Sequence, residues 1–262
     1  MKVCMTDRQT LYQAAAAAFD SMRIEPVVVE LGVLRGENAQ VLQASLRPRQ
    51  LFLVDSWCAR TLVAHYSPFD PIPAWVRPVT DFAHYFGGPM EDQSTFDRLY
   101  EDCAGRFENQ PRVTILRGDT IDELARLRGE LGGDASVDFL YVDANHQYEF
   151  VFRELMEYAS LCRPESLMML NDCCHSAGGQ RQNLGVLEAV ARFIKVSDFR
   201  PIALTSTDYS DVVLARAGSR IGQVFAKVLE QSTIAHVDVP HQLLAAARVV
   251  YGSQGRVNIS FM

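Results

Sequence analysis

The chain has 262 residues, of which 48% are hydrophobic and 22% are charged, and its net charge is −7. This composition is that of an ordinary globular protein, and the length suits one large domain or one domain with an appendage. Scattered Lys and Arg in an acidic chain argue against a nucleic-acid partner, because phosphate backbones are bound by clustered basic residues. No apolar run reaches the roughly 20 residues that span a bilayer. The first residues also lack the apolar core of a secretory signal, so we expect a cytoplasmic protein with no membrane partner.

Short apolar, β-branched segments alternate with longer helical patterns along the chain. This alternation predicts an α/β fold in which helices cover both faces of a mostly parallel sheet. The expected strands lie at residues 26–31, 50–55, 112–116, 137–143, 166–170, 200–205 and 212–216. The expected helices lie at residues 11–22, 38–46, 148–161, 184–195 and 222–230.

The helix expected at residues 148–161 is amphipathic. Phe152, Leu155, Met156 and Ala159 share one stripe of its surface, which we expect to face the sheet. Pro164 is expected to end this helix, because proline cannot donate a backbone hydrogen bond.

Two segments fall outside the alternation. Residues 57–90 are long and rich in aromatic residues and prolines, as in lids and ligand-binding loops, so we expect them to cover an acceptor. A packed insertion without ligand contact is the alternative. Residues 217–262 follow the last expected strand of a domain over residues 1–216. They form an extension that either enlarges the fold or joins copies of the chain into a homo-oligomer.

The six cysteines follow neither zinc-finger nor CxxC redox spacing, and we expect them to be reduced. The run Cys173-Cys174-His175 could suggest zinc, but adjacent cysteines rarely bind one ion together and the sequence offers no second pair.

A turn with two glycines, Glu30-Leu31-Gly32-Val33-Leu34-Arg35-Gly36, joins an expected strand to an expected helix. Glycines at such a junction let a ligand approach the backbone, although a tight turn that only packs helix on strand would need them too. The Gly-x-x-x-Gly spacing differs from the GxGxxG of dinucleotide-binding proteins. Asp55 ends the next strand, where an acidic residue about 20 residues after the glycines holds ribose hydroxyls. Together these features predict a ligand that contains adenosine.

Polar residues also end two later strands. Asp143 is followed by His146, and Asn171 and Asp172 end the next strand. Neighbouring parallel strands lie about 4.8 Å apart, so the three oxygen-bearing side chains could converge on Mg²⁺. Alternatively, the carboxylates cap helices or contact the ligand without a metal. His146 titrates near neutral pH and could accept a hydroxyl proton, with His175 as the alternative base.

The strand-end segments described above resemble, in their order and spacing, those of the class I S-adenosylmethionine (SAM)-dependent methyltransferases. The resemblance covers roughly residues 10–216 and is most similar to the branch of macrocin-type and mycinamicin-type sugar O-methyltransferases and cephalosporin-biosynthesis proteins. The layout also resembles the metal-dependent catechol O-methyltransferases. The segments that carry it are VELGVLRGENA, LFLVDSW, LRGDT, FLYVDANHQYEFVFREL and SLMMLNDCCHS.

The resemblance implies a Rossmann-like fold with a mostly parallel, seven-stranded sheet, and SAM as cofactor. It further implies that Asp143 and the pair Asn171-Asp172 bind a divalent metal and that His146 is the general base, although sugar-modifying relatives often have two acids in this pair. The residues expected around SAM are Glu30, Gly32 and Gly36 at its methionine part, Asp55 and Ser56 at the ribose, Gly118, Asp119 and Thr120 at the adenine, and Asp143.

From these features we expect an O-methyltransferase, assisted by a divalent metal, that modifies a small-molecule hydroxyl in natural product biosynthesis. A sugar, a diol or a phenol would fit. One alternative is a metal-independent N-, C- or carboxyl methyltransferase. Another is a noncatalytic SAM-binding assembly protein that keeps the fold without the chemistry.

Overall fold

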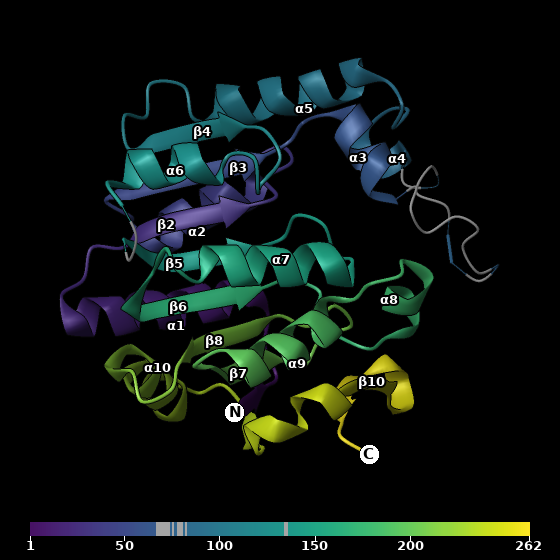
Figure 1. Cartoon of the computed structure of the whole chain (residues 1–262). Helices are drawn as coiled ribbons and strands as arrows, with labels where there is room; N and C mark the ends of the chain where they lie inside the picture. Colours follow the sequence, from purple (N-terminus) through teal and green to yellow (C-terminus); the bar gives the residue numbers. More distant parts are fainter. Residues whose placement is uncertain (67–73, 75, 78–80, 82, 134–135) are drawn as a thin grey trace.

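The computed structural model describes residues 1–66, 74, 76–77, 81, 83–133 and 136–262. A nine-stranded sheet forms the middle layer of the molecule, in the order β4-β3-β2-β5-β6-β8-β7-β1-β9, and a hairpin pairs β10 with β11 (Figure 1). The strands are β1 (Lys2–Cys4), β2 (Val27–Leu31), β3 (Gln50–Asp55), β4 (Val113–Arg117), β5 (Val137–Val142), β6 (Cys162–Leu170), β7 (Phe199–Thr205), β8 (Val212–Arg216), β9 (His236–Asp238), β10 (Arg248–Tyr251) and β11 (Val257–Ser260).

Helices cover both faces of the sheet, because alternate residues of each central strand pack on opposite sides. One hydrophobic cluster joins the sheet to α1, α2, α5 and α10, and the other joins it to α6, α7 and α9. The helices are α1 (Arg8–Met22), α2 (Glu37–Leu46), α3 (Ala59–Tyr66), α4 (Ala83–Phe86), α5 (Gln93–Arg106), α6 (Leu124–Leu131), α7 (Tyr148–Tyr158), α8 (Ala177–Arg181), α9 (Val186–Val196) and α10 (Arg220–Gln231).

The expected Rossmann-like α/β fold is confirmed, and the sheet is two strands wider than the seven we expected. Strand β1 pairs with β7 in parallel, and β9 pairs with β1 in the antiparallel direction. Both strands have three residues, which is too short for a recognisable hydrophobic pattern. The Lys2 ammonium joins them, since it lies 2.9 Å from Asp238 of β9 and 3.0 Å from Glu230 of α10.

Residues 217–262 share the core of the preceding chain. Helix α10 packs along α1 and buries Ile221, Phe225 and Leu229 in the same cluster. Helix α10 thus belongs to the same core as α1, whereas a role of residues 217–262 in joining copies of the chain stays a prediction.

The expected helix at residues 148–161 differs from α7 in its end and in its buried face. The helix ends at Tyr158, and Pro164 lies inside β6, which pairs with β5 from Cys162 onward. The buried face contains Glu154 and Tyr158, whereas Met156 of the predicted stripe is 45% exposed. Phe152, Leu155 and Ala159 of the predicted stripe do pack in the core, so the prediction was wrong for Met156 and missed Glu154, because it counted apolar residues alone.

None of the helices in the described part of the chain is both long and apolar enough to cross a membrane.

The strand order reverses between β2 and β5, which is where ligands bind in open α/β sheets. Here Leu31 O accepts a hydrogen bond from Asp143 N at 2.8 Å, and Gly32 N donates to Val54 O at 2.9 Å. Gly32 has a φ of +81°, and a Cβ at this position would lie 2.1 Å from Asp143 O. Only glycine therefore lets these strand ends meet.

We expect Gly32→Ala to lower the free energy of unfolding by at least about 2 kcal/mol, since it combines a strained φ with a backbone clash. Gly129→Ala is the matched control, because Gly129 lies in α6 with open space around it. Urea unfolding followed by circular dichroism checks both variants. Equal stability of Gly32→Ala and the wild type would contradict the close approach.

Candidate cofactor and acceptor site

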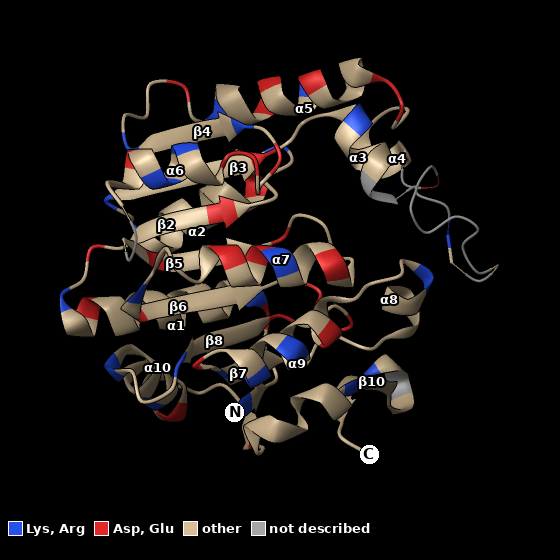
Figure 2. Cartoon of the chain, viewed as in Figure 1, with Lys and Arg blue, Asp and Glu red and all other residues tan. Residues whose placement is uncertain are grey.

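A cavity of about 1040 Å³ lies at the carboxyl ends of the central parallel strands. Figure 2 colours part of β2 as acidic, and the acidic residue in the sequence of this strand is Glu30. Expected site residues that line the cavity are Glu30, Gly32, Asp55, Ser56, Asp119, Thr120, Asp143, His146, Asn171 and Asp172.

Three other residues from the sequence analysis lie away from the cavity lining. A Cβ at Gly36 would meet the side chains of Phe107 and Cys103, and one at Gly118 would meet Glu123. His175 lies 3.5 Å from Glu188, so the structure does not bring this alternative base to the cavity.

The Asp55 carboxylate organises the glycine turn. Its Oδ2 accepts hydrogen bonds from Val33 N at 2.8 Å and Leu34 N at 2.9 Å, and its Oδ1 accepts one from Trp57 N at 3.1 Å. The same residue that we expected at the ribose therefore also fixes the backbone of the turn.

Glu30 is fully buried in β2 beside the cavity. Its Oε1 accepts a hydrogen bond from the Asn38 amide at 2.8 Å, whereas its Oε2 has no hydrogen-bond partner among the described residues. Burial raises the pKa of Glu30 well above its ordinary value, and the nearby charges of Asp143 and Asp55 add to this. A cationic group that entered the cavity could donate a hydrogen bond to Glu30 Oε2.

The loop after β4 is held by a buried residue of α7 that the sequence analysis missed. The Thr120 hydroxyl donates to Glu154 Oε1 at 2.6 Å, and the Tyr158 hydroxyl donates to Thr120 O at 2.5 Å. Burial raises the pKa of Glu154 to about 7. Asp119 Oδ1 accepts from Ile121 N at 2.9 Å, which shapes the same loop.

At the other end of the cavity, His146 lies between two carboxylates. Its Nε2 is 3.1 Å from Asp143 Oδ1 and 3.7 Å from Asp172 Oδ2. The Asn171 amide donates to the same Asp143 oxygen at 2.9 Å. Burial opposes a charge on His146, but the hydrogen bond with Asp143 and the charge of Asp172 outweigh it and raise the pKa of His146 to about 9.

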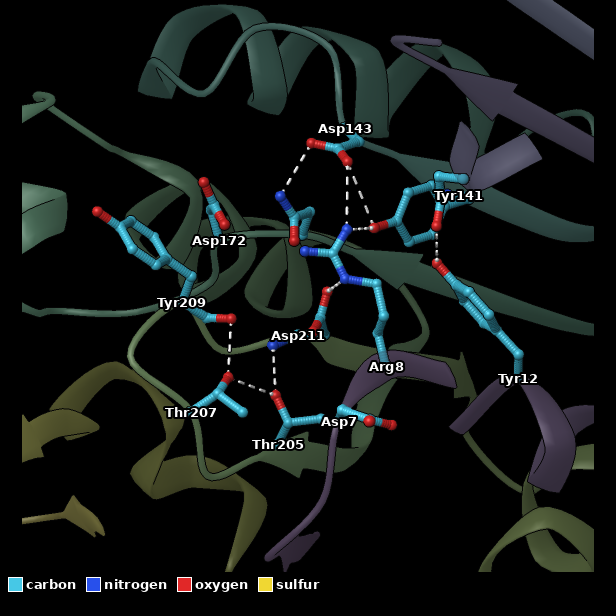
Figure 3. Close-up of polar contacts among 12 residues, drawn as sticks. Asp7, Arg8, Tyr12, Tyr141, Asp143, Asp172, Thr205, Thr207, Tyr209 and Asp211 are labelled. Atoms are coloured by element: carbon cyan, nitrogen blue, oxygen red, sulfur yellow. Dashed lines mark hydrogen bonds and ion pairs between the residues drawn. The ribbon is translucent and has the colours of Figure 1, made fainter. Parts of the chain in front are cut away.

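Arg8 and Asp211 complete this end of the site, and sequence reasoning found neither. Figure 3 shows the Arg8 side chain between Asp143 and Asp211, beside the Tyr141 hydroxyl. The Arg8 guanidinium is 3.6 Å from Asp143 and 3.7 Å from Asp211, and it lines the cavity.

Parts of the expected lid, residues 57–90, contribute to the cavity. Trp57 is buried and donates through Nε1 to Leu34 O at 2.7 Å, and Val76, Tyr85 and Phe86 join it in the lining. The side chain of Tyr66 and residues Phe69, Trp75 and Phe82, which we also expected in the lid, lie outside the described residues. A lid motion stays a prediction.

A family model described as a methyltransferase domain matches residues 29–173, which is more than half of the chain and contains the strand ends that form the cavity. The chain belongs to this methyltransferase family. The expected enzyme class is thereby confirmed. The search of curated proteins finds no match for this methyltransferase.

Several solved structures are similar to this methyltransferase at low sequence identity. A candidate caffeoyl-CoA O-methyltransferase from Staphylococcus aureus is 10% identical, with a TM-score of 0.50 over 82% of this chain and 86% of its own. The O-methyltransferase TomG from Streptomyces achromogenes, solved with SAM, is 16% identical, with a TM-score of 0.46 over 82% and 92%. An O-methyltransferase from Bacillus cereus, solved with S-adenosylhomocysteine (SAH), is 14% identical, with a TM-score of 0.45 over 79% and 78%.

The raised pKa of Glu154 predicts how stability depends on pH. The folded protein keeps the Glu154 proton up to about pH 7, whereas the unfolded chain releases it near the ordinary value of 4.5. As pH rises between these values, the unfolding free energy of the wild type should fall by on the order of 3 kcal/mol relative to Glu154→Gln. Urea unfolding at several pH values measures this difference.

Glu157→Gln is the control, because Glu157 is exposed on the same helix. Parallel pH profiles for the wild type and Glu154→Gln would show that Glu154 is not protonated in the folded protein.

Proposed function

We propose that this methyltransferase uses SAM and transfers its methyl group to an oxygen atom of a small-molecule acceptor such as a sugar, a diol or a phenol. The observation that carries the proposal is Glu30 Oε2, a buried oxygen with no hydrogen-bond partner among the described residues, on a side chain that lines one cavity with Asp55 at the reversal of strand order. SAM supplies a methyl group on a positively charged sulfur, together with an ammonium group, ribose hydroxyls and an adenine.

The polar groups of the cavity suit these parts of SAM. Glu30 Oε2 would accept a hydrogen bond from the ammonium, and this pairing would stabilise the charged form of the buried carboxylate. Asp55 would accept from the ribose hydroxyls while it keeps the glycine turn in place. Asp119 and Thr120 would border the adenine, on the loop that Glu154 holds.

Of the residues expected to bind Mg²⁺, Asn171 has a buried Oδ1 with no hydrogen-bond partner among the described residues, but Asp143 has no carboxylate oxygen left for a metal. Both oxygens of Asp143 already have partners, since Oδ1 contacts Asn171 and His146 and Oδ2 contacts Tyr141 and Arg8. In the described part of the chain, no group of three or more His, Cys, Asp or Glu side chains has an arrangement that could hold a metal ion. No step of the proposed reaction therefore passes through a metal.

We propose His146 as the residue that takes the acceptor proton. It lines the cavity, and Asp143 and Asp172 orient its ring. Removing the proton from a hydroxyl makes the oxygen a better nucleophile toward the methyl group. The cavity would hold acceptor and cofactor together, which lowers the entropic cost of the transfer.

SAH binding tests the cofactor part of the proposal. We expect Glu30→Gln and Asp55→Asn each to weaken SAH at least about tenfold by calorimetry, since each removes a hydrogen bond to a charged group. Glu25→Gln is the control, because Glu25 borders a separate pocket at the opposite end of the sheet. If the wild type does not bind SAH, the cofactor assignment is wrong.

Thermal melts of the same variants show whether the fold is intact. If the Glu30→Gln protein is folded and binds SAH with wild-type affinity, Glu30 does not contact the cofactor.

The pH dependence of turnover tests the base. A histidine whose pKa is about 9 carries a proton at neutral pH and loses it as pH rises, so turnover should increase with pH and level off above about pH 9. His146→Gln should lower turnover by roughly 10²–10⁴-fold and abolish this dependence. The measurement is SAH release from SAM with a panel of sugars, diols and phenols.

A pH-independent rate in the wild type, or full activity in His146→Gln, would place the base elsewhere. SAH binding without turnover across the whole panel would favour a noncatalytic SAM-binding protein. Methyl transfer to nitrogen, carbon or carboxyl acceptors alone would favour the other metal-independent classes.

A further inference from the structure

Arg8 is placed by the start of α1. The Asp7 side chain caps this helix by accepting a hydrogen bond from Thr10 N at 3.0 Å, so Arg8 is the first helical residue. The first turn of α1 lies near the carboxyl ends of the parallel strands, where the Arg8 side chain extends between Asp143 and Asp211 (Figure 3). A helix cap therefore sets the position of a guanidinium inside the site.

The Arg8 guanidinium lies near two carboxyl groups that flank different strands, Asp143 after β5 and Asp211 before β8. Nη1 donates to the Tyr141 hydroxyl at 2.8 Å and lies 3.6 Å from Asp143 Oδ2. Nε lies 3.7 Å from Asp211 Oδ1. The cation thus bridges the end of β5 and the start of β8, on either side of the end of β6 in the sheet.

Asp211 is buried beside this cation. Its side chain is 3% exposed, and its Oδ1 has no hydrogen-bond partner among the described residues. Hydrogen bonds between Asp211 and Thr205, at 2.9 Å and 2.7 Å, fix the backbone at this position. Burial raises the pKa of Asp211 to about 8, whereas the Arg8 charge favours the ionised form, so Arg8 is the counterion of this side chain when Asp211 loses its proton.

We propose that Arg8 supplies the fixed positive charge of the acceptor half of the cavity, in the place where the metal-dependent enzymes that this sequence resembles bind a divalent ion, so that the enzyme works without one. The role of Arg8 in methyl transfer rests on the proposed function, whereas its effect on metal binding can be tested separately. In this proposal the Arg8 guanidinium takes the place of the Mg²⁺ ion that the sequence predicted at Asp143.

The exposure of the guanidinium to the cavity defines what the acceptor must offer. The Arg8 side chain is 32% exposed and lines the cavity with His146 and Asp172. A guanidinium keeps its charge at all relevant pH values and donates several hydrogen bonds in a fixed plane. It would bind the acceptor oxygen and favour its deprotonated form. Acceptors with acidic hydroxyls, such as phenols, suit this arrangement best.

The binding of Mn²⁺, measured by electron paramagnetic resonance on the SAH-loaded protein, tests the proposal without an acceptor. We expect no bound Mn²⁺ in the wild type. Arg8→Met removes the charge at similar length and should bind Mn²⁺, with a Kd at least about tenfold below the highest concentration at which the wild type binds none. Arg8→Lys keeps one charge and should bind none.

Arg163→Met is the matched control. Arg163 also pairs with a buried carboxylate, since its Nε is 3.3 Å from Asp138, but it lies at the opposite end of the sheet, where its Nε also donates to Ser136 O at 3.2 Å. This variant should gain no Mn²⁺ binding, because one carboxylate alone holds a divalent ion poorly.

Three results would overturn the proposal. They are Mn²⁺ binding by the wild type that Asp143→Asn abolishes, loss of wild-type turnover in a chelator with recovery on added Mg²⁺, and a folded Arg8→Met protein that gains no Mn²⁺ affinity. If Arg8→Met does not fold, the wild type and Arg8→Lys decide the question through Mn²⁺ binding and chelator resistance. Failure of SAH binding in the wild type would reject the proposed function but leave the Mn²⁺ measurement in free protein valid.

Discussion

The close approach of β2 and β5 at Gly32 is the constraint on which the site depends. Without a side chain at Gly32, the backbone of Asp143 can lie against the turn, and β2, β3 and β5 end at one place. The Asp55 carboxylate then binds the backbone N–H groups of the same turn. One tight contact between strand ends therefore places the buried Glu30, the turn and Asp143 around a common cavity.

The sequence predicted the strand-end residues well, because parallel strands bring their carboxyl ends to one edge of the sheet. Asp55, Asp143 and the pair at 171–172 follow buried apolar segments, and the structure places all of them in the cavity lining. Their hydrogen-bond partners could not be predicted in the same way. The magnesium site expected at Asp143 depends on what surrounds that carboxylate, and spacing along the chain does not contain this information.

The residues that the sequence analysis missed do not follow the ends of parallel strands. They are Arg8, Glu154 and Asp211. Asp211 precedes β8, but β8 runs antiparallel to β6, so the start of β8 lies where β6 ends. Arg8 begins a helix that precedes β2, and the cap at Asp7 defines that beginning. Glu154 was missed because a search for apolar stripes cannot detect a buried carboxyl that binds Thr120.

The pairing of β1 has a consequence for how the protein is made. Lys2–Cys4 pairs with Ala203–Thr205 of β7, so the first strand leaves the ribosome long before its partner is synthesised. Strand β9, which covers the outer edge of β1, is made later still. Contacts between distant parts of a chain form slowly, and unpaired strands are prone to aggregate in the meantime. The central parallel strands are synthesised before β7 and β9, so this edge of the sheet is the last to be completed.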